Sequence, residues 1–84
     1  MKIVITKKAR KQLDKIPANI QEKIISKVLA LKDQPIGAQS KKLTNQPGYR
    51  LKIGDYRVLY LIDFELNKII VSRIKHRKDV YRNL

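Results

Sequence analysis

Apolar and charged residues alternate along the second half of the chain, and this pattern predicts β-strands. Successive side chains of a strand point to opposite faces of a sheet, so each strand can direct apolar residues to one face and cations to the other. Short turns at Gly54-Asp55 and at Asp63 to Asn67 separate the alternating stretches. These stretches are residues 49–53, 56–62 and about 68–75. We therefore predict three consecutive antiparallel strands.

The charged positions of the predicted strands point to an anion site. In the third stretch, a strict period of two places Ile69 and Val71 on the face of the cations and Ile74 on the other face. If the strands pair in register, five cations gather on one concave surface, for which a polyphosphate is the natural ligand. These cations are Arg50, Lys52, Arg57, Arg73 and Lys75.

The first residues predict a short strand followed by a helix. Lys2 to Ile5 is brief and rich in β-branched residues, as is typical of an edge strand. Thr6 is a suitable N-cap for a helix from Lys7 to about Ile16, and Pro17 ends that helix. The apolar stripe of this helix consists of Ala9, Leu13 and Ile16.

A second helix is predicted directly after the proline. Asn19 and Glu22 fit an imperfect capping box at its start, and the run QPIG at residues 34–37 stops it. Its wider apolar stripe consists of Ile20, Ile24, Ile25, Val28, Leu29 and Leu31. Residues 38–47 are polar and predict a loop, with Leu43 turned inward.

These elements predict one α+β domain over residues 1–84. The order is β-α-α-β-β-β, with an N-terminal helical hairpin packed on one face of an antiparallel sheet. Tyr49, Tyr56 and Tyr60 have the parity of the apolar face and are predicted to lie in the core. The residues from His76 to Leu84 predict a turn or a brief C-terminal helix.

The strongly basic composition narrows the classes of partner. The chain has 20 Lys and Arg residues against 7 Asp and Glu, a formal net charge of +13, which exceeds what solubility needs. Nucleic acid is therefore the first expected partner, an acidic protein the second, and an anionic membrane surface a distant third. With no cysteine and a single histidine, we predict neither a metal site nor a cofactor. No apolar run reaches membrane-spanning or signal-peptide length, which predicts a cytoplasmic protein without a membrane partner.

Two runs of the sequence, with the order of elements, resemble the RelE/ParE superfamily of bacterial and archaeal toxins, and in particular its RelE branch. The runs are GYRLKIGDYRVLYLID, residues 48–63, and IVSRIKHRKDVY, residues 70–81. The resemblance implies a toxin of a type II toxin–antitoxin system, a ribosome-dependent endonuclease that cleaves mRNA in the ribosomal A site and inhibits translation. The implied partners are the ribosome, mRNA and a cognate antitoxin with an acidic, partly disordered segment. Operator DNA is a further expected ligand of the toxin–antitoxin complex.

The resemblance also implies roles for individual residues. Metal-free cleavage uses the ribose 2′-OH as nucleophile and needs a base, positive charge at the phosphate and an acid for the leaving 5′-oxygen. Lys52 matches the residue that acts as the general base in RelE toxins, and neighbouring cations favour the neutral amine that a general base requires. Arg57 matches the phosphate clamp, because its planar guanidinium can bind two phosphate oxygens. Lys75 matches the acid and Tyr81 a ring that stacks on a nucleobase.

Several alternatives stay open at this point. Lys75 stands where an arginine is usual in RelE toxins, so His76 or Arg77 can instead be the proton donor. The predicted RNA-binding residues are Arg50, Arg73, His76 and Arg77. Arg57 also has a structural alternative, an ion pair with Asp55 or Asp63. Two other functions compete: a ParE-like poison of DNA gyrase, and a basic module that binds RNA or DNA without catalysis.

Overall fold

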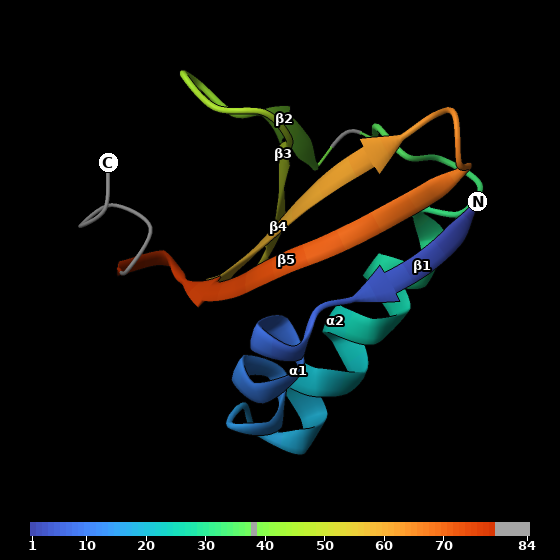
Figure 1. Cartoon of the computed structure of the whole chain (residues 1–84). Helices are drawn as coiled ribbons and strands as arrows, with labels where there is room; N and C mark the ends of the chain where they lie inside the picture. Colours follow the sequence, from blue (N-terminus) through green and yellow to red (C-terminus); the bar gives the residue numbers. More distant parts are fainter. Residues whose placement is uncertain (38, 79–84) are drawn as a thin grey trace.

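Two helices cover one face of a five-stranded sheet (Figure 1). The computed structural model describes residues 1–37 and 39–78. The elements are β1 (Lys2–Ile5), α1 (Lys7–Asp14), α2 (Ala18–Ala30), β2 (Ser40–Lys42), β3 (Tyr49–Ile53), β4 (Tyr56–Asp63) and β5 (Lys68–His76). The predicted α+β class and the helical hairpin on the sheet are confirmed. Within the described residues, neither helix has the length and hydrophobicity needed to cross a membrane.

The sheet is mixed, with strand order β1-β5-β4-β3-β2, so the prediction of a purely antiparallel sheet was wrong. The strands β3 to β5 form the expected antiparallel series and β2 extends it at one edge, but β1 pairs in parallel with β5 at the other edge. The prediction that residues 38–47 form only a loop was also wrong, because Ser40 to Lys42 pair with β3. A polar three-residue strand carries no apolar alternation and cannot be recognised from its pattern.

Side-chain hydrogen bonds define both ends of α1. Thr6 caps α1 as predicted, since its hydroxyl accepts a hydrogen bond of 3.2 Å from the Ala9 N–H. The predicted capping box at Asn19 was wrong, because α2 begins after Pro17 without a side-chain cap. Gln21 instead closes the preceding helix, donating from its amide to the carbonyl oxygens of Leu13 and Ile16, both at 2.8 Å.

The core lies between the helices and one face of the sheet. Its buried residues are Ala9, Leu13, Ile16, Ile24, Val28, Leu31, Leu51, Ile53, Val58, Tyr60, Ile69, Val71 and Ile74. Tyr49 and Tyr56 pack against it, so the predicted position of the three tyrosines is confirmed. The predicted stripe of the second helix was too wide, because Ile25 and Leu29 are 42% and 47% exposed.

Tyr60 ties the core to the segment that joins α2 and β2. Its hydroxyl donates a hydrogen bond of 2.6 Å to the Pro35 carbonyl and is hydrogen-bonded to the Ser40 hydroxyl at 2.8 Å. Burial raises the pKa of the Tyr60 phenol, because the charged form would lose its hydration.

A β-bulge in β5 decides which side chains reach each face of the sheet. Leu59 pairs with Arg73 but Tyr60 pairs with Val71, which leaves Ser72 as an extra residue on β5. The extra residue shifts the parity of the strand, so that Val71 is buried in the core while Arg73 is exposed. The prediction from strict alternation, which put Ile69 and Val71 on the cationic face, was therefore wrong.

Candidate functional site

Three cations lie side by side across the central strands of the sheet. Lys52 of β3 is directly opposite Arg57 of β4, which is directly opposite Lys75 of β5. Each alternates along its strand with core residues and therefore projects from the face away from the helices, here called the outer face. Opposed residues have Cβ atoms only about 4.5–5.5 Å apart, and like charges at that spacing destabilise a sheet. This cationic row (Lys52, Arg57 and Lys75) is therefore better suited to bind an anion than to stabilise the fold.

A second line of cations lies one step along the same face. Arg50 and Arg73 both pair with Leu59, one from each side of β4. The structure thus brings all five of the predicted cations to the outer face. Lys41 joins them, since it pairs with Arg50 on the short edge strand. The sequence pattern did not identify Lys41, because its segment has no recognisable strand signal.

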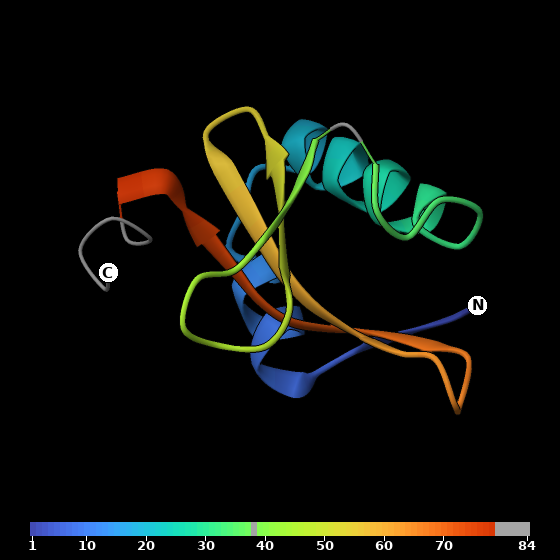
Figure 2. The ribbon, with the colours of Figure 1, turned by 90° about the horizontal axis from the view of Figure 1, so that it is seen from above.

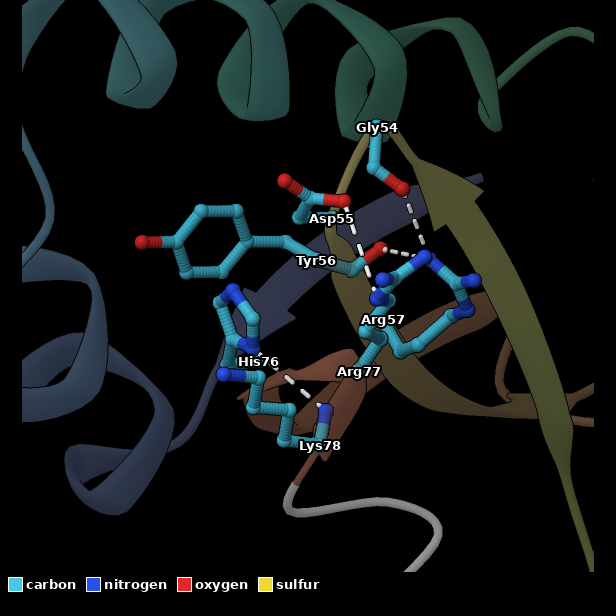
Figure 3. Close-up of polar contacts among 7 residues, drawn as sticks. All are labelled: Gly54, Asp55, Tyr56, Arg57, His76, Arg77 and Lys78. Atoms are coloured by element: carbon cyan, nitrogen blue, oxygen red, sulfur yellow. Dashed lines mark hydrogen bonds and ion pairs between the residues drawn. The ribbon is translucent and has the colours of Figure 1, made fainter.

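Arg57 is the most constrained member of the cationic row. It is 7% exposed, and its Nη1 donates hydrogen bonds to the carbonyl oxygens of Gly54 at 2.8 Å and Tyr56 at 2.9 Å (Figure 3). These bonds hold the guanidinium against the turn of the β3–β4 hairpin. By contrast, Lys52 is exposed and Lys75 is half-buried. A fixed guanidinium between two ammonium groups is a preorganised arrangement for an anion.

The end of β5 is attached to the same turn through Arg77. The Arg77 N–H donates a hydrogen bond of 2.7 Å to the Asp55 carbonyl, and its Nε lies 3.9 Å from the Asp55 carboxylate (Figure 3). Within residues 1–37 and 39–78 this is the one ion pair, and both side chains in it are exposed. The alternative in which Arg57 pairs with Asp55 or Asp63 does not occur there. Arg77 therefore lies next to the cationic row.

The structure separates His76 from the cationic row. His76 pairs with Tyr56 across the strands and contacts the edge of its ring, with centroids 5.3 Å apart, on the side of the sheet that carries the helices (Figure 3). Its Nδ1 accepts a hydrogen bond of 3.4 Å from the Lys78 N–H. Tyr81, the other aromatic residue predicted for the site, lies outside the described residues. Of the three candidate proton donors, Lys75 is the one in the row itself.

No cluster of three or more metal-ligating side chains of the His, Cys, Asp or Glu type occurs in the part of the chain that the structure describes. The outer face instead offers ammonium and guanidinium groups. Such groups bind phosphate through charge and through hydrogen bonds donated to its oxygens. The arrangement is chemically suited to hold a phosphodiester and to place amino groups on both sides of it.

Comparisons with known proteins show what the whole chain is similar to. The sequence model of the ParE toxin of type II toxin–antitoxin systems matches residues 3–81. The chain is 30% identical to toxin RelG of Mycobacterium tuberculosis over 92% of this chain and 91% of RelG. It is 28% identical to the putative toxin RelE1 of Methanocaldococcus jannaschii, over 96% of this chain and 94% of that protein. Among solved structures, it is similar to a chain of the RelBE2 toxin–antitoxin complex of M. tuberculosis, with a TM-score of 0.81, 28% identity and coverage of 90% and 96%.

Proposed function

The chain belongs to the RelE/ParE family of toxins of type II toxin–antitoxin systems, and from this premise we propose that it is a ribosome-dependent mRNA endonuclease. In this proposal it cleaves the transcript in the ribosomal A site by attack of a ribose 2′-OH, and so inhibits translation in the cytoplasm. The observation that carries the proposal is the register that aligns Lys52, Arg57 and Lys75 on adjacent strands.

The three side chains of the cationic row supply the groups that transesterification requires. Lys52 acts as the general base that removes the proton of the 2′-OH, and the deprotonated 2′-oxygen then attacks the adjacent phosphorus. Arg57, between the two lysines, balances the negative charge that develops on the phosphate oxygens. Lys75 donates a proton to the departing 5′-oxygen, which leaves a 2′,3′-cyclic phosphate and a 5′-OH. The base and the acid stand on opposite sides of the arginine, as attacking and leaving oxygens stand on opposite sides of the phosphorus.

The surrounding cations bind the RNA strand rather than react with it. Arg50 and Arg73 extend the positive outer face along the strands, and Arg77 extends it past the end of β5. Tyr81 keeps its proposed role as a stacking ring. His76 has a weaker case as proton donor, because its ring lies with Tyr56 on the other side of the sheet.

We further propose a cognate antitoxin as the protein partner. The similar M. tuberculosis chain was solved in a toxin–antitoxin complex. A chain with a net charge of +13 attracts an acidic segment, and such a segment would neutralise the face that RNA needs. Operator DNA is the proposed ligand of the complex.

Poisoning of DNA gyrase is the second candidate function, and the match to the ParE toxin model is the observation that favours it. The cationic row argues for RNA cleavage, since a protein that only docks on an enzyme has no need for three aligned cations of this kind.

Cleavage mapping tests the proposal directly. Ribosomes stalled with a defined codon in the A site are incubated with the protein, and primer extension then locates the new RNA ends. We expect cuts within the A-site codon that end in a cyclic phosphate. The Lys52→Gln variant should cut about 10²–10⁴-fold more slowly, the usual contribution of a general acid or base. Its folding should be unchanged within about 0.5 kcal/mol, because the side chain is exposed.

Lys8→Gln provides the matched control, since it removes the same charge from an exposed position of α1. This variant should cleave at the unsubstituted rate. Intact transcripts together with gyrase-dependent DNA breaks would reject the endonuclease proposal in favour of the gyrase poison. Equal loss of cleavage in both variants would show that only total charge matters.

A further inference from the structure

A groove runs between α2 and the end of β3, and one of its lining residues, Lys52, also belongs to the cationic row. It has a volume of about 670 Å³, within the range of pockets that hold a whole ligand rather than a single ion. Its lining residues are Asn19, Glu22, Lys23, Ser26, Lys27, Gln39, Lys52, Ile53 and Gly54. Figure 2 shows the first turns of α2 beside the end of β3, where the groove lies. We call it the α2 groove.

The end of β3, where it extends past β2, forms the sheet side of this groove. The pairing of β2 with β3 begins at Ser40 opposite Leu51, and beyond it the Lys52 N–H donates one more bond, of 3.1 Å, to the Gln39 carbonyl. The chain of β3 continues to Ile53 and Gly54 past the end of β2. Ile53 and Gly54 therefore line one side of the groove, and α2 lines the other.

One side of α2 supplies the opposite wall. Lys23 and Lys27 are four residues apart and Ser26 lies three residues after Lys23, so the three share one side of the helix. The groove contains three lysines and one carboxylate, Glu22, which gives a formal charge of +3 − 1 = +2. The hydroxyl of Ser26 is a hydrogen-bond donor of the kind that contacts phosphate.

Lys52 connects the groove to the site of the proposed chemistry. It is a member of the cationic row and also lines the α2 groove. When one phosphodiester of an RNA strand lies at the cationic row, the next phosphates of that strand are one or two nucleotides away from it. The α2 groove is the adjacent positively charged channel that those phosphates can enter.

We propose that the α2 groove binds the sugar-phosphate backbone of the same RNA strand, next to the phosphodiester held at the cationic row. Lys23 and Lys27 are the phosphate-binding residues, and Glu22 limits their affinity by repulsion. This proposal rests on the proposed function for the identity of the ligand. It adds a binding site that explains how so small a protein positions a flexible strand over the row.

The test measures binding as a function of salt. The probe is a single-stranded RNA oligonucleotide with 2′-O-methyl groups, which cannot be cleaved because the nucleophile is blocked. Its dissociation constant is measured by fluorescence anisotropy between about 50 and 200 mM salt, where each phosphate contact on a single strand contributes a slope of roughly 0.7. The Lys23→Gln/Lys27→Gln variant should lower the slope by about 1.4, the sum of two such contacts.

Two further variants make the test specific. Lys7→Gln/Lys11→Gln removes two exposed lysines with the same four-residue spacing from α1, and its slope should equal that of the unsubstituted chain. Glu22→Gln should have the opposite effect and tighten binding. With a dinucleotide, which can occupy the row alone, the Lys23/Lys27 variant should bind as the unsubstituted chain does.

Each remaining outcome refutes the inference. Equal slopes for the two double variants, or no detectable RNA binding at the lowest salt, would remove the groove as an RNA site. Unchanged RNA binding with weakened binding of the antitoxin would assign the groove to an acidic protein instead. Programmed ribosomes distinguish mRNA from ribosomal RNA as the bound strand. If the groove contacts ribosomal RNA, the Lys23→Gln/Lys27→Gln variant should bind ribosomes more weakly but bind the free oligonucleotide as the unsubstituted chain does. The proposed function stands or falls separately, by the effect of Lys52→Gln on cleavage.

Discussion

Replacement of Arg57 by methionine separates the structural role of this side chain from its proposed role in cleavage. Methionine replaces the aliphatic stem of arginine and suits a buried position, but it lacks the guanidinium group and so removes the charge and both hydrogen bonds to the hairpin turn. Arg57 is 7% exposed and donates to the carbonyl oxygens of Gly54 and Tyr56. We therefore expect two measurable effects, on folding and on cleavage, of different size.

The structure indicates how large each effect should be. Hydrogen bonds from a charged donor contribute roughly 1.5–3 kcal/mol each, and carbonyls of a surface turn can regain water, so the loss in folding free energy should be about 2–3 kcal/mol. A domain of this length has a stability of about 4–13 kcal/mol, so even the lowest value leaves roughly five folded molecules for each unfolded one. Loss of the cation at the phosphate should slow cleavage about 10²–10³-fold. Unfolding therefore cannot account for the predicted loss of cleavage.

The assay combines urea denaturation, followed by circular dichroism, with single-turnover cleavage on programmed ribosomes. The rate is divided by the folded fraction of each variant. Arg10→Met serves as control, because Arg10 is exposed on α1, and both its stability and its rate should be unchanged. If Arg57→Met cleaves at the control rate per folded molecule, Arg57 only supports the hairpin and the proposed mechanism is wrong.

Two further predictions concern the fold that supports the site. Tyr60→Phe should destabilise the protein by about 1–3 kcal/mol, because it leaves the Pro35 carbonyl without its partner, as measured by urea denaturation at neutral pH. The raised pKa of Tyr60 favours the neutral phenol in the folded state, so the contribution of this group to folding stability is complete below pH about 10 and is lost as the pH rises through the folded-state pKa. The Tyr60→Phe variant should lack this loss of stability at alkaline pH. Identical profiles of stability against pH for the two proteins would contradict the assignment. Gly48→Ala should destabilise by more than about 1 kcal/mol, because Gly48 has φ +111° and a Cβ would lie 2.8 Å from the Tyr60 carbonyl oxygen. Gly37→Ala, whose nearest neighbour would be 3.8 Å away, should leave the melting temperature unchanged, and equal shifts for the two glycines would refute this explanation.

Local patterns in the sequence were sufficient to identify most of the elements. The N-cap at Thr6, the break at Pro17 and the turn at Gly54-Asp55 each depend on a few neighbouring residues. The strand β2 and the parallel pairing of β1 with β5 were missed. The partner of β1 lies 66 residues further along the chain, and β2 is a polar strand of three residues without apolar alternation.

The sequence alone determined that the chain is a basic α+β domain and that its strands carry cations opposite their apolar residues. The period of two was enough to assign Arg50, Lys52 and Arg57 to one face, because their strands are regular. The same period placed Lys75 with them, but only the tertiary structure decided that Val71 of the same strand turns to the core. That outcome depends on the bulge at Ser72, whose hydroxyl donates to the Leu59 carbonyl and whose carbonyl accepts from the Thr6 hydroxyl. Contacts between residues so distant in the chain set the register, and the register places the three cations side by side.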